Sequence, residues 1–137
     1  MRTPRPKKKP TFIFNFKKQF APAVESGTKW QTVRANRADG KRPAPGDIVK
    51  LYTGLRTTAN RLLRQATCIR CRAVRIDSTD RLLIVDGQRL DHVEALAFAL
   101  ADGFTTLDAF FSFFHDTYPA RPFEGFCVEW DESLPAT

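Results

Sequence analysis

Apolar and polar residues alternate in short runs along much of the first half of the chain, which is the pattern of half-buried β-strands. The run TFIFNFK at residues 11–17 shows it best, because its three phenylalanines fall on one face of an extended strand. The segment DGKRPAPG at residues 39–46 is a loop by composition and separates two such runs. We therefore expect strands at residues 11–17, 30–35, 47–52, 67–76, 81–85 and 123–130.

Helical spacing replaces this alternation in much of the second half. Residues 91–101 are rich in alanine and leucine and predict a helix, and a shorter one is expected at residues 20–26. Thr105 and Asp108 resemble a capping pair that opens a further helix. The apolar stripe of that helix, which we expect to be core rather than a platform for stacking bases, consists of Leu107, Phe110, Phe111 and Phe114.

These elements predict the fold class and the domain limits. A strand-rich first half, two helices and a closing strand indicate an α+β fold, which we expect to be a small, mostly antiparallel β-barrel with helices covering its openings. The length of 137 residues suits one domain, expected at residues 11–132. Residues 1–10, with three prolines and five basic side chains, predict a disordered basic arm, and residues 133–137 a flexible tail.

The charge of the chain is asymmetric, and this bears on its partners. The net charge is +7, but residues 1–75 hold 19 Lys and Arg against 3 Asp and Glu, whereas residues 76–137 hold 3 against 12. The two halves could neutralise each other across one fold. The excess positive charge must still face water, however, and it favours a polyanionic partner such as nucleic acid.

Other classes of protein are disfavoured by what the sequence lacks. No run approaches the ~20 apolar residues that span a bilayer, and no apolar segment follows the basic N-terminus, so we expect a cytoplasmic protein that does not bind membranes. The three cysteines suit that compartment as reduced thiols. Cys68 and Cys71 form a C-x-x-C without a second ligand pair and fall on a predicted strand, where residues three apart face opposite ways. We expect neither a metal nor a cofactor.

The densest group of polar side chains lies in GTKWQTVR at residues 27–34. Thr32 and Arg34 are two apart and share a face of the predicted strand, while Lys29 falls in the turn before it, where its long stem can curl back. A threonine hydroxyl beside a buried amine is a workable nucleophile and base, and Arg34 could hold a phosphate or a carbonyl oxygen. A solvated strand with ordinary polar residues would show the same composition.

The order of motifs resembles that of a known family. The segments FNFKKQFAPAVESGTKWQTVR, GDIVKLYTGLR, ADGFTTLDAFFSFF and FCVEW follow one another from the first predicted strand to the last. In this order they resemble the ASCH family, whose members are relatives of the PUA domains of RNA-modifying proteins. The G-x-K-x-x-T-x-R block at residues 27–34 is the most telling part.

The resemblance implies a PUA-like barrel with a basic cleft for RNA or nucleotides. One branch of the family resembles amidohydrolases that remove acyl groups from the N4 amine of cytidine derivatives. Carried over by motif, Lys29 would be the base, Thr32 the nucleophile and Arg34 the substrate clamp. The glutamate of that triad falls on Asp102, which is one methylene shorter, and a misplacement of about 1 Å can cost about a hundredfold in rate. Other members are ribonucleases, so RNA hydrolysis also stays open.

Three further residues could line the same cleft: Lys17 at the end of the first strand, Tyr52 as a stacking ring and Arg56 as a phosphate ligand. The leading hypothesis is a monomeric module that binds RNA, a nucleotide or a modified nucleoside. The first alternative is a hydrolase that uses Lys29, Thr32 and Asp102. The second is an interaction protein whose acidic helices dock a partner.

Overall fold

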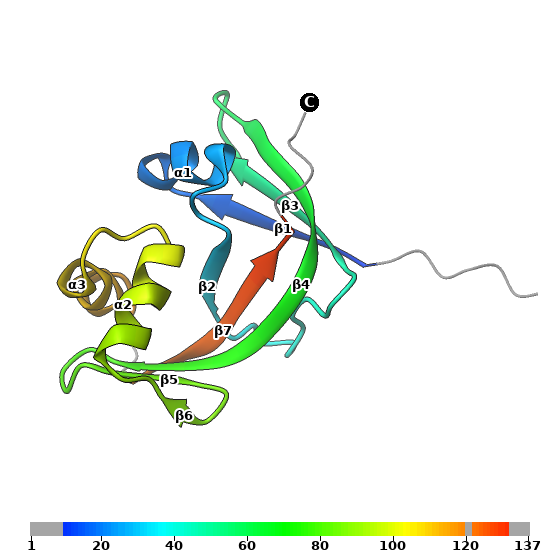
Figure 1. Cartoon of the computed structure of the whole chain (residues 1–137). Coiled ribbons are helices and arrows are strands. Elements are labelled where there is room, and N and C mark those ends of the chain that lie inside the picture. Colours follow the sequence, from blue (N-terminus) through cyan, green and yellow to red (C-terminus); the bar gives the residue numbers. More distant parts are fainter. Residues whose placement is uncertain (1–9, 120–121, 132–137) are drawn as a thin grey trace, which may run out of the picture.

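The computed structural model describes residues 10–119 and 122–131, and within them it confirms an α+β fold with a mixed, mostly antiparallel sheet (Figure 1). The predicted basic arm, apart from Pro10, and the predicted tail lie outside these residues. The strands are β1 (Thr11–Phe16), β2 (Gln31–Ala35), β3 (Ile48–Thr53), β4 (Arg61–Asp77), β5 (Leu82–Val85), β6 (Gln88–Arg89) and β7 (Phe123–Trp130). The helices are the 3-10 turn η1 (Lys18–Phe20), α1 (Ala21–Ser26), α2 (His92–Ala101) and α3 (Leu107–Thr117).

Strand β4 is the central strand of the sheet, because it pairs with β3, β5 and β7, and it is longer than the sequence pattern indicated. Its 17 residues curve across the molecule (Figure 1), so that its first half pairs with β3 and its second half with β7 and β5. β1 adds to β3 in parallel, and β2 adds to β7 in antiparallel fashion. β1 and β2 thereby become the two strands that face each other across the unpaired side of the curved sheet.

The predicted barrel is wrong in one respect, because the sheet does not close. Among the described residues, β1 pairs with β3 alone and β2 with β7 alone. A side chain joins them where a backbone ladder would be: the Arg34 Nη2 of β2 donates to the carbonyl oxygen of Asn15 in β1 at 2.8 Å. Paired strands lie about 4.8 Å apart, which leaves no room for a guanidinium between them.

Two apolar clusters fill the molecule. One packs α2 and α3 against β4, β5 and β7, and it buries Phe110, Phe111 and Phe114 to 3 % exposure or less. The expectation that this phenylalanine stripe is core is therefore confirmed. The other cluster lies inside the curve of β1, β3, β4 and β7 beneath α1, and its largest fully buried side chains are Trp130 and Phe126.

The N-terminal ends of α2 and α3 are fixed by side-chain caps. Asp91 and Glu94 form a reciprocal capping box at the start of α2. At α3 the cap is Thr106, whose hydroxyl accepts from the backbone N–H of Ala109 at 3.0 Å, one residue later than the predicted Thr105. None of the described helices is long and apolar enough to cross a membrane.

A β-bulge in β4 overturns one argument about the cysteines. Cys68 pairs with Trp130 and Cys71 with Val128, two residues apart on β7, so the extra residue in β4 brings both thiols onto the same face. Both contact the cluster around Trp130. Burial raises the pKa of each thiol to about 11, which keeps them protonated at neutral pH.

Candidate functional site

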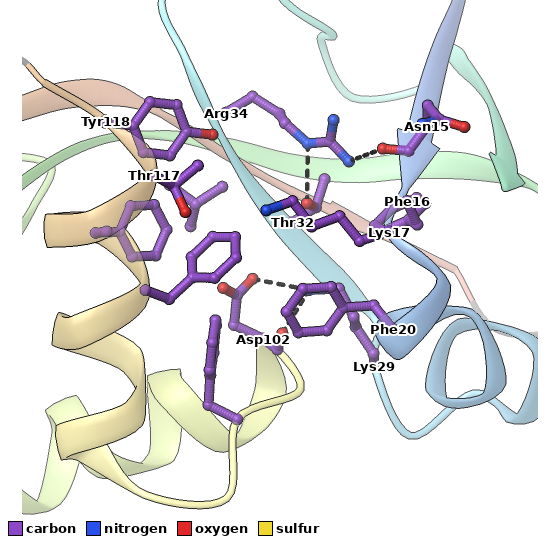
Figure 2. Close-up of a pocket in the computed structure, with 14 residues that line it drawn as sticks. Asn15, Phe16, Lys17, Phe20, Lys29, Thr32, Arg34, Asp102, Thr117 and Tyr118 are labelled. Atoms are coloured by element: carbon purple, nitrogen blue, oxygen red, sulfur yellow. Dashed lines mark hydrogen bonds and ion pairs between the residues drawn. The ribbon is translucent and has the colours of Figure 1, made fainter. Parts of the chain in front are cut away.

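A cavity of about 220 Å³ lies on the open side of the sheet, between β1, β2 and the two long helices (Figure 2). Five of the seven side chains selected from the sequence line it, and they come from separate segments of the chain. Lys17 follows β1, Lys29 precedes β2, Thr32 and Arg34 lie on β2, and Asp102 ends α2. The shared face of Thr32 and Arg34, expected from strand alternation, is confirmed.

Lys29 and Asp102 form a buried ion pair at the base of the cavity, each with only 3 % of its surface exposed. The Lys29 Nζ lies 3.1 Å from Asp102 Oδ1 and also donates to the Asp102 backbone carbonyl. That carbonyl stands at the C-terminal end of α2, where a cation satisfies an unpaired acceptor and suits the helix dipole. Gly103 allows the Lys29 side chain to come this close to the end of α2. At its φ of 93° a side chain would be strained, and a Cβ would lie 3.1 Å from Lys29 Cδ.

Burial shifts the pKa of both partners in the direction that favours their neutral forms. Loss of solvation lowers the pKa of the Lys29 amine, and the Asp102 carboxylate opposes that shift. Loss of solvation raises the pKa of Asp102, and the amine opposes it in turn. An amine held in this way releases a proton more readily than a surface lysine, which is the property that a general base requires.

Thr32 is held by Arg34 rather than by Lys29. Its hydroxyl oxygen accepts from Arg34 Nε at 3.2 Å, and within the described residues Lys29 makes no hydrogen bond to it. The guanidinium also lies over the Phe16 ring, 4.9 Å from its centroid, and bonds to Asn15 as described above. Four groups therefore fix the arginine: a hydroxyl, a carbonyl and the rings of Phe14 and Phe16.

Aromatic rings form the wall opposite these polar groups. Phe20, Phe104 and Phe113 contact one another with centroids 5.3 to 5.6 Å apart, and Tyr118 points its hydroxyl toward the Arg34 side (Figure 2). Burial raises the pKa of Tyr118, and the nearby Arg34 charge opposes the shift. Sequence reasoning missed Phe113 and Tyr118. The available signal was that Phe113 falls beside the buried stripe of α3 rather than within it.

Tyr52 and Arg56 are not among the residues that line this cavity. Tyr52 lies on β3, and β1 stands between β3 and the open side of the sheet. Arg56 is exposed in the turn after β3, with a positive φ of 67°. The structure thus separates these two from the other five.

No family model, curated protein or solved structure matches this chain. The fold and the site define an α+β domain with a small cavity that is aromatic on one side and charged on the other. Its function has to be inferred from the residues of that cavity.

Proposed function

We propose that this chain binds RNA or a nucleotide and that one base or modified nucleoside enters the cavity between β1, β2 and α3. The observation that carries the proposal is the convergence of a buried ion pair, a fixed arginine and an aromatic wall on one small cavity. Binding sites for small molecules have this composition, with apolar and aromatic walls and a few oriented polar groups. Ionisable groups whose pKa is shifted by burial also cluster at functional sites.

The dimensions and chemistry of the cavity suit a single planar ring system. Its volume of about 220 Å³ is below the roughly 300 Å³ at which cavities for drug-sized ligands begin. Phe113 and Tyr118 offer ring faces and edges for a base, and proteins that bind unpaired nucleotides use such rings. The Arg34 guanidinium and the Thr32 hydroxyl can hydrogen-bond to carbonyl and amine groups on the edge of the base.

Two features of the sequence point the same way. Lys29, Thr32 and Arg34 of the G-x-K-x-x-T-x-R block that resembles the ASCH family line the cavity together with Asp102. The positive charge of residues 1–75 would attract a phosphate backbone. A PUA-like ASCH domain would bring RNA to a cleft of this kind.

The test is calorimetric titration of the protein with cytidine, uridine, adenosine, guanosine and N4-acetylcytidine. We expect one nucleoside to bind, and Arg34→Gln to weaken it at least tenfold, because a hydrogen bond to a charged group contributes about 1.5–3 kcal/mol. Arg75→Gln removes the same charge from an exposed position on β4 and should leave the affinity unchanged. Absence of binding by all five nucleosides at millimolar concentration would rule the proposal out.

A hydrolase is the second candidate, and the Lys29–Asp102 pair beside Thr32 is the observation that favours it. In this mechanism the Thr32 hydroxyl attacks the acyl carbon of an N4-acylcytidine and passes its proton to the Lys29 amine. Arg34 stabilises the oxyanion, the C–N bond breaks, and the N4 amine takes up the proton. Water then hydrolyses the threonine ester. Lys29 would first have to turn from Asp102 toward Thr32.

Chromatography of N4-acetylcytidine incubated with the protein separates the two candidates. Turnover that is kept by Thr32→Ser and abolished by Thr32→Val would establish the hydrolase, since valine matches threonine in shape but lacks the hydroxyl. Binding without release of cytidine, at enzyme concentrations close to those of the substrate, would leave the binding function alone. A short RNA incubated in parallel tests for ribonuclease activity.

A further inference from the structure

A second hollow adjoins the cavity and opens toward solvent on the far side of β1. It has a volume of about 630 Å³ and shares Asn15, Phe16 and Lys17 with the cavity. Beyond them it is lined by Lys18, by the start of α1 and by residues of the turn between β3 and β4. The two hollows therefore border each other at these three residues.

The boundary between the two hollows is rich in donors that have no acceptor. Lys17 and Lys18 form no ion pair within the described residues, and the Lys17 ammonium lies over the Phe113 ring, 5.0 Å from its centroid. The Asn15 side-chain oxygen accepts from the backbone N–H of Leu55 at 3.0 Å, which assigns the remaining Asn15 amide hydrogens as donors.

The carboxylates near the groove are already engaged. Glu25 pairs with Arg61, a cation of the groove wall, and Asp102 pairs with Lys29 inside the cavity. The Lys18 side chain and the Asn15 amide thus border a space whose nearest acids are paired with other cations, and the Lys17 ammonium lies on its cavity side, over Phe113. A phosphate group, which accepts several charge-assisted hydrogen bonds, is the complement of such a set.

We propose that the groove bounded by Asn15, Lys17 and Lys18 holds the phosphate attached to the nucleoside in the cavity, so that the ligand is a nucleotide rather than a free nucleoside. This inference rests on the proposed function, because it takes the cavity as the base site. It adds the ligand class and the direction in which the ligand leaves the cavity. The phosphate can be terminal, as in a free nucleotide, or a diester within an RNA strand.

The experiment compares cytidine, cytidine 5′-monophosphate and the dinucleotide ApC by calorimetric titration of the full chain. We expect the monophosphate to bind about tenfold more tightly than cytidine, with the advantage shrinking as salt rises. Lys18→Gln should lower the ratio of the two affinities, because it removes one of the two lysine charges at the groove. Lys41→Gln removes the same charge from an exposed residue that lines neither hollow, and it should leave the ratio unchanged.

Each result has one meaning. Equal affinities for cytidine and its monophosphate, or a ratio that survives Lys18→Gln, would overturn the phosphate site while the base site stands. Failure of these three ligands and of the other four nucleosides to bind would refute the base site and the phosphate site together. Binding of ApC at least as tight as that of the monophosphate would identify the diester of a strand, and weaker binding the terminal phosphate.

Discussion

Lys29 and Asp102 each lose their hydration on folding, and the fold tolerates this because each supplies the partner of the other. The helix-end carbonyl of Asp102 and the rings of Phe16 and Phe20 complete the surroundings of the ammonium group. Buried ion pairs of this kind seldom add much net stability over well-packed apolar residues. Their presence in a cavity is therefore better explained by a role in ligand binding or proton transfer than by stability.

Breaking one side of this pair should be costly, and replacing both sides much less so. Asp102→Leu leaves an uncompensated buried ammonium group and should lower the free energy of unfolding by about 3–5 kcal/mol. The double variant Lys29→Met with Asp102→Leu should recover most of that loss. Urea denaturation of the three proteins measures both values, and a double variant as unstable as the single one would contradict this account.

At the scale of the elements, β2 is held by close backbone contact with β7. Gly125 on β7 pairs with Ala35, and a Cβ built on Gly125 would lie 2.0 Å from the Arg34 carbonyl oxygen. No side chain fits there without moving one strand away from the other. The position of Arg34 and Thr32 in the cavity thus depends on a glycine that contributes no atom to it.

Gly125→Ala should therefore disturb both stability and binding. We expect it to lower the free energy of unfolding by at least 2 kcal/mol, in the range of overpacked cores, and to weaken nucleoside binding through displaced Thr32 and Arg34. Gly40→Ala is the comparison: nothing lies within 4 Å of its Cβ, so only its φ of 71° costs energy, about 1–2 kcal/mol. Thermal unfolding and calorimetry measure the two effects, and equal binding by both variants would argue against this dependence.

The buried Cys68 thiol on β4 makes the free energy of unfolding depend on pH in the alkaline range. The folded-state pKa of the Cys68 thiol is about 11, above its ordinary value of 9.0, so the unfolded chain loses this proton first. The stabilising contribution is complete below pH 9 and is lost as the pH rises toward 11. Urea denaturation under reducing conditions should show a smaller fall between pH 8 and pH 10.5 in Cys68→Ala than in the unchanged protein. An identical fall would contradict the assignment to this thiol.

On the scale of the whole molecule, local sequence patterns predicted the strands and helices well, but they did not predict that the sheet stays open. Alternation located β1 and β7, and the phenylalanine stripe placed α3 on the core. The open sheet was not predictable from the sequence, because closure depends on whether β1 and β2 pair. In the structure the Arg34 side chain lies between these two strands. The bulge at Cys68 escaped prediction for a similar reason, since it exists only in the register with β7.

The site was predictable as far as its residues share a short motif. Lys29, Thr32 and Arg34 lie within six residues, and Asp102 was reached through the family resemblance; all four line the cavity. Phe113 and Tyr118 were missed because helical spacing shows which residues share a face but does not show that a cavity adjoins that face. Tyr52 and Arg56 were selected by residue type alone, and one intervening strand separates Tyr52 from the cavity.

The central claim is that the cavity between β1, β2 and α3 is the place where a nucleoside binds. The most direct test is a titration of ¹⁵N-labelled protein with each of the five nucleosides, followed through the backbone amide signals in NMR spectra. The account predicts that the signals that move belong to residues around Phe16, Thr32, Gly103 and Tyr118. Signals that stay fixed with all five nucleosides, or that move only at residues away from the cavity, would contradict it.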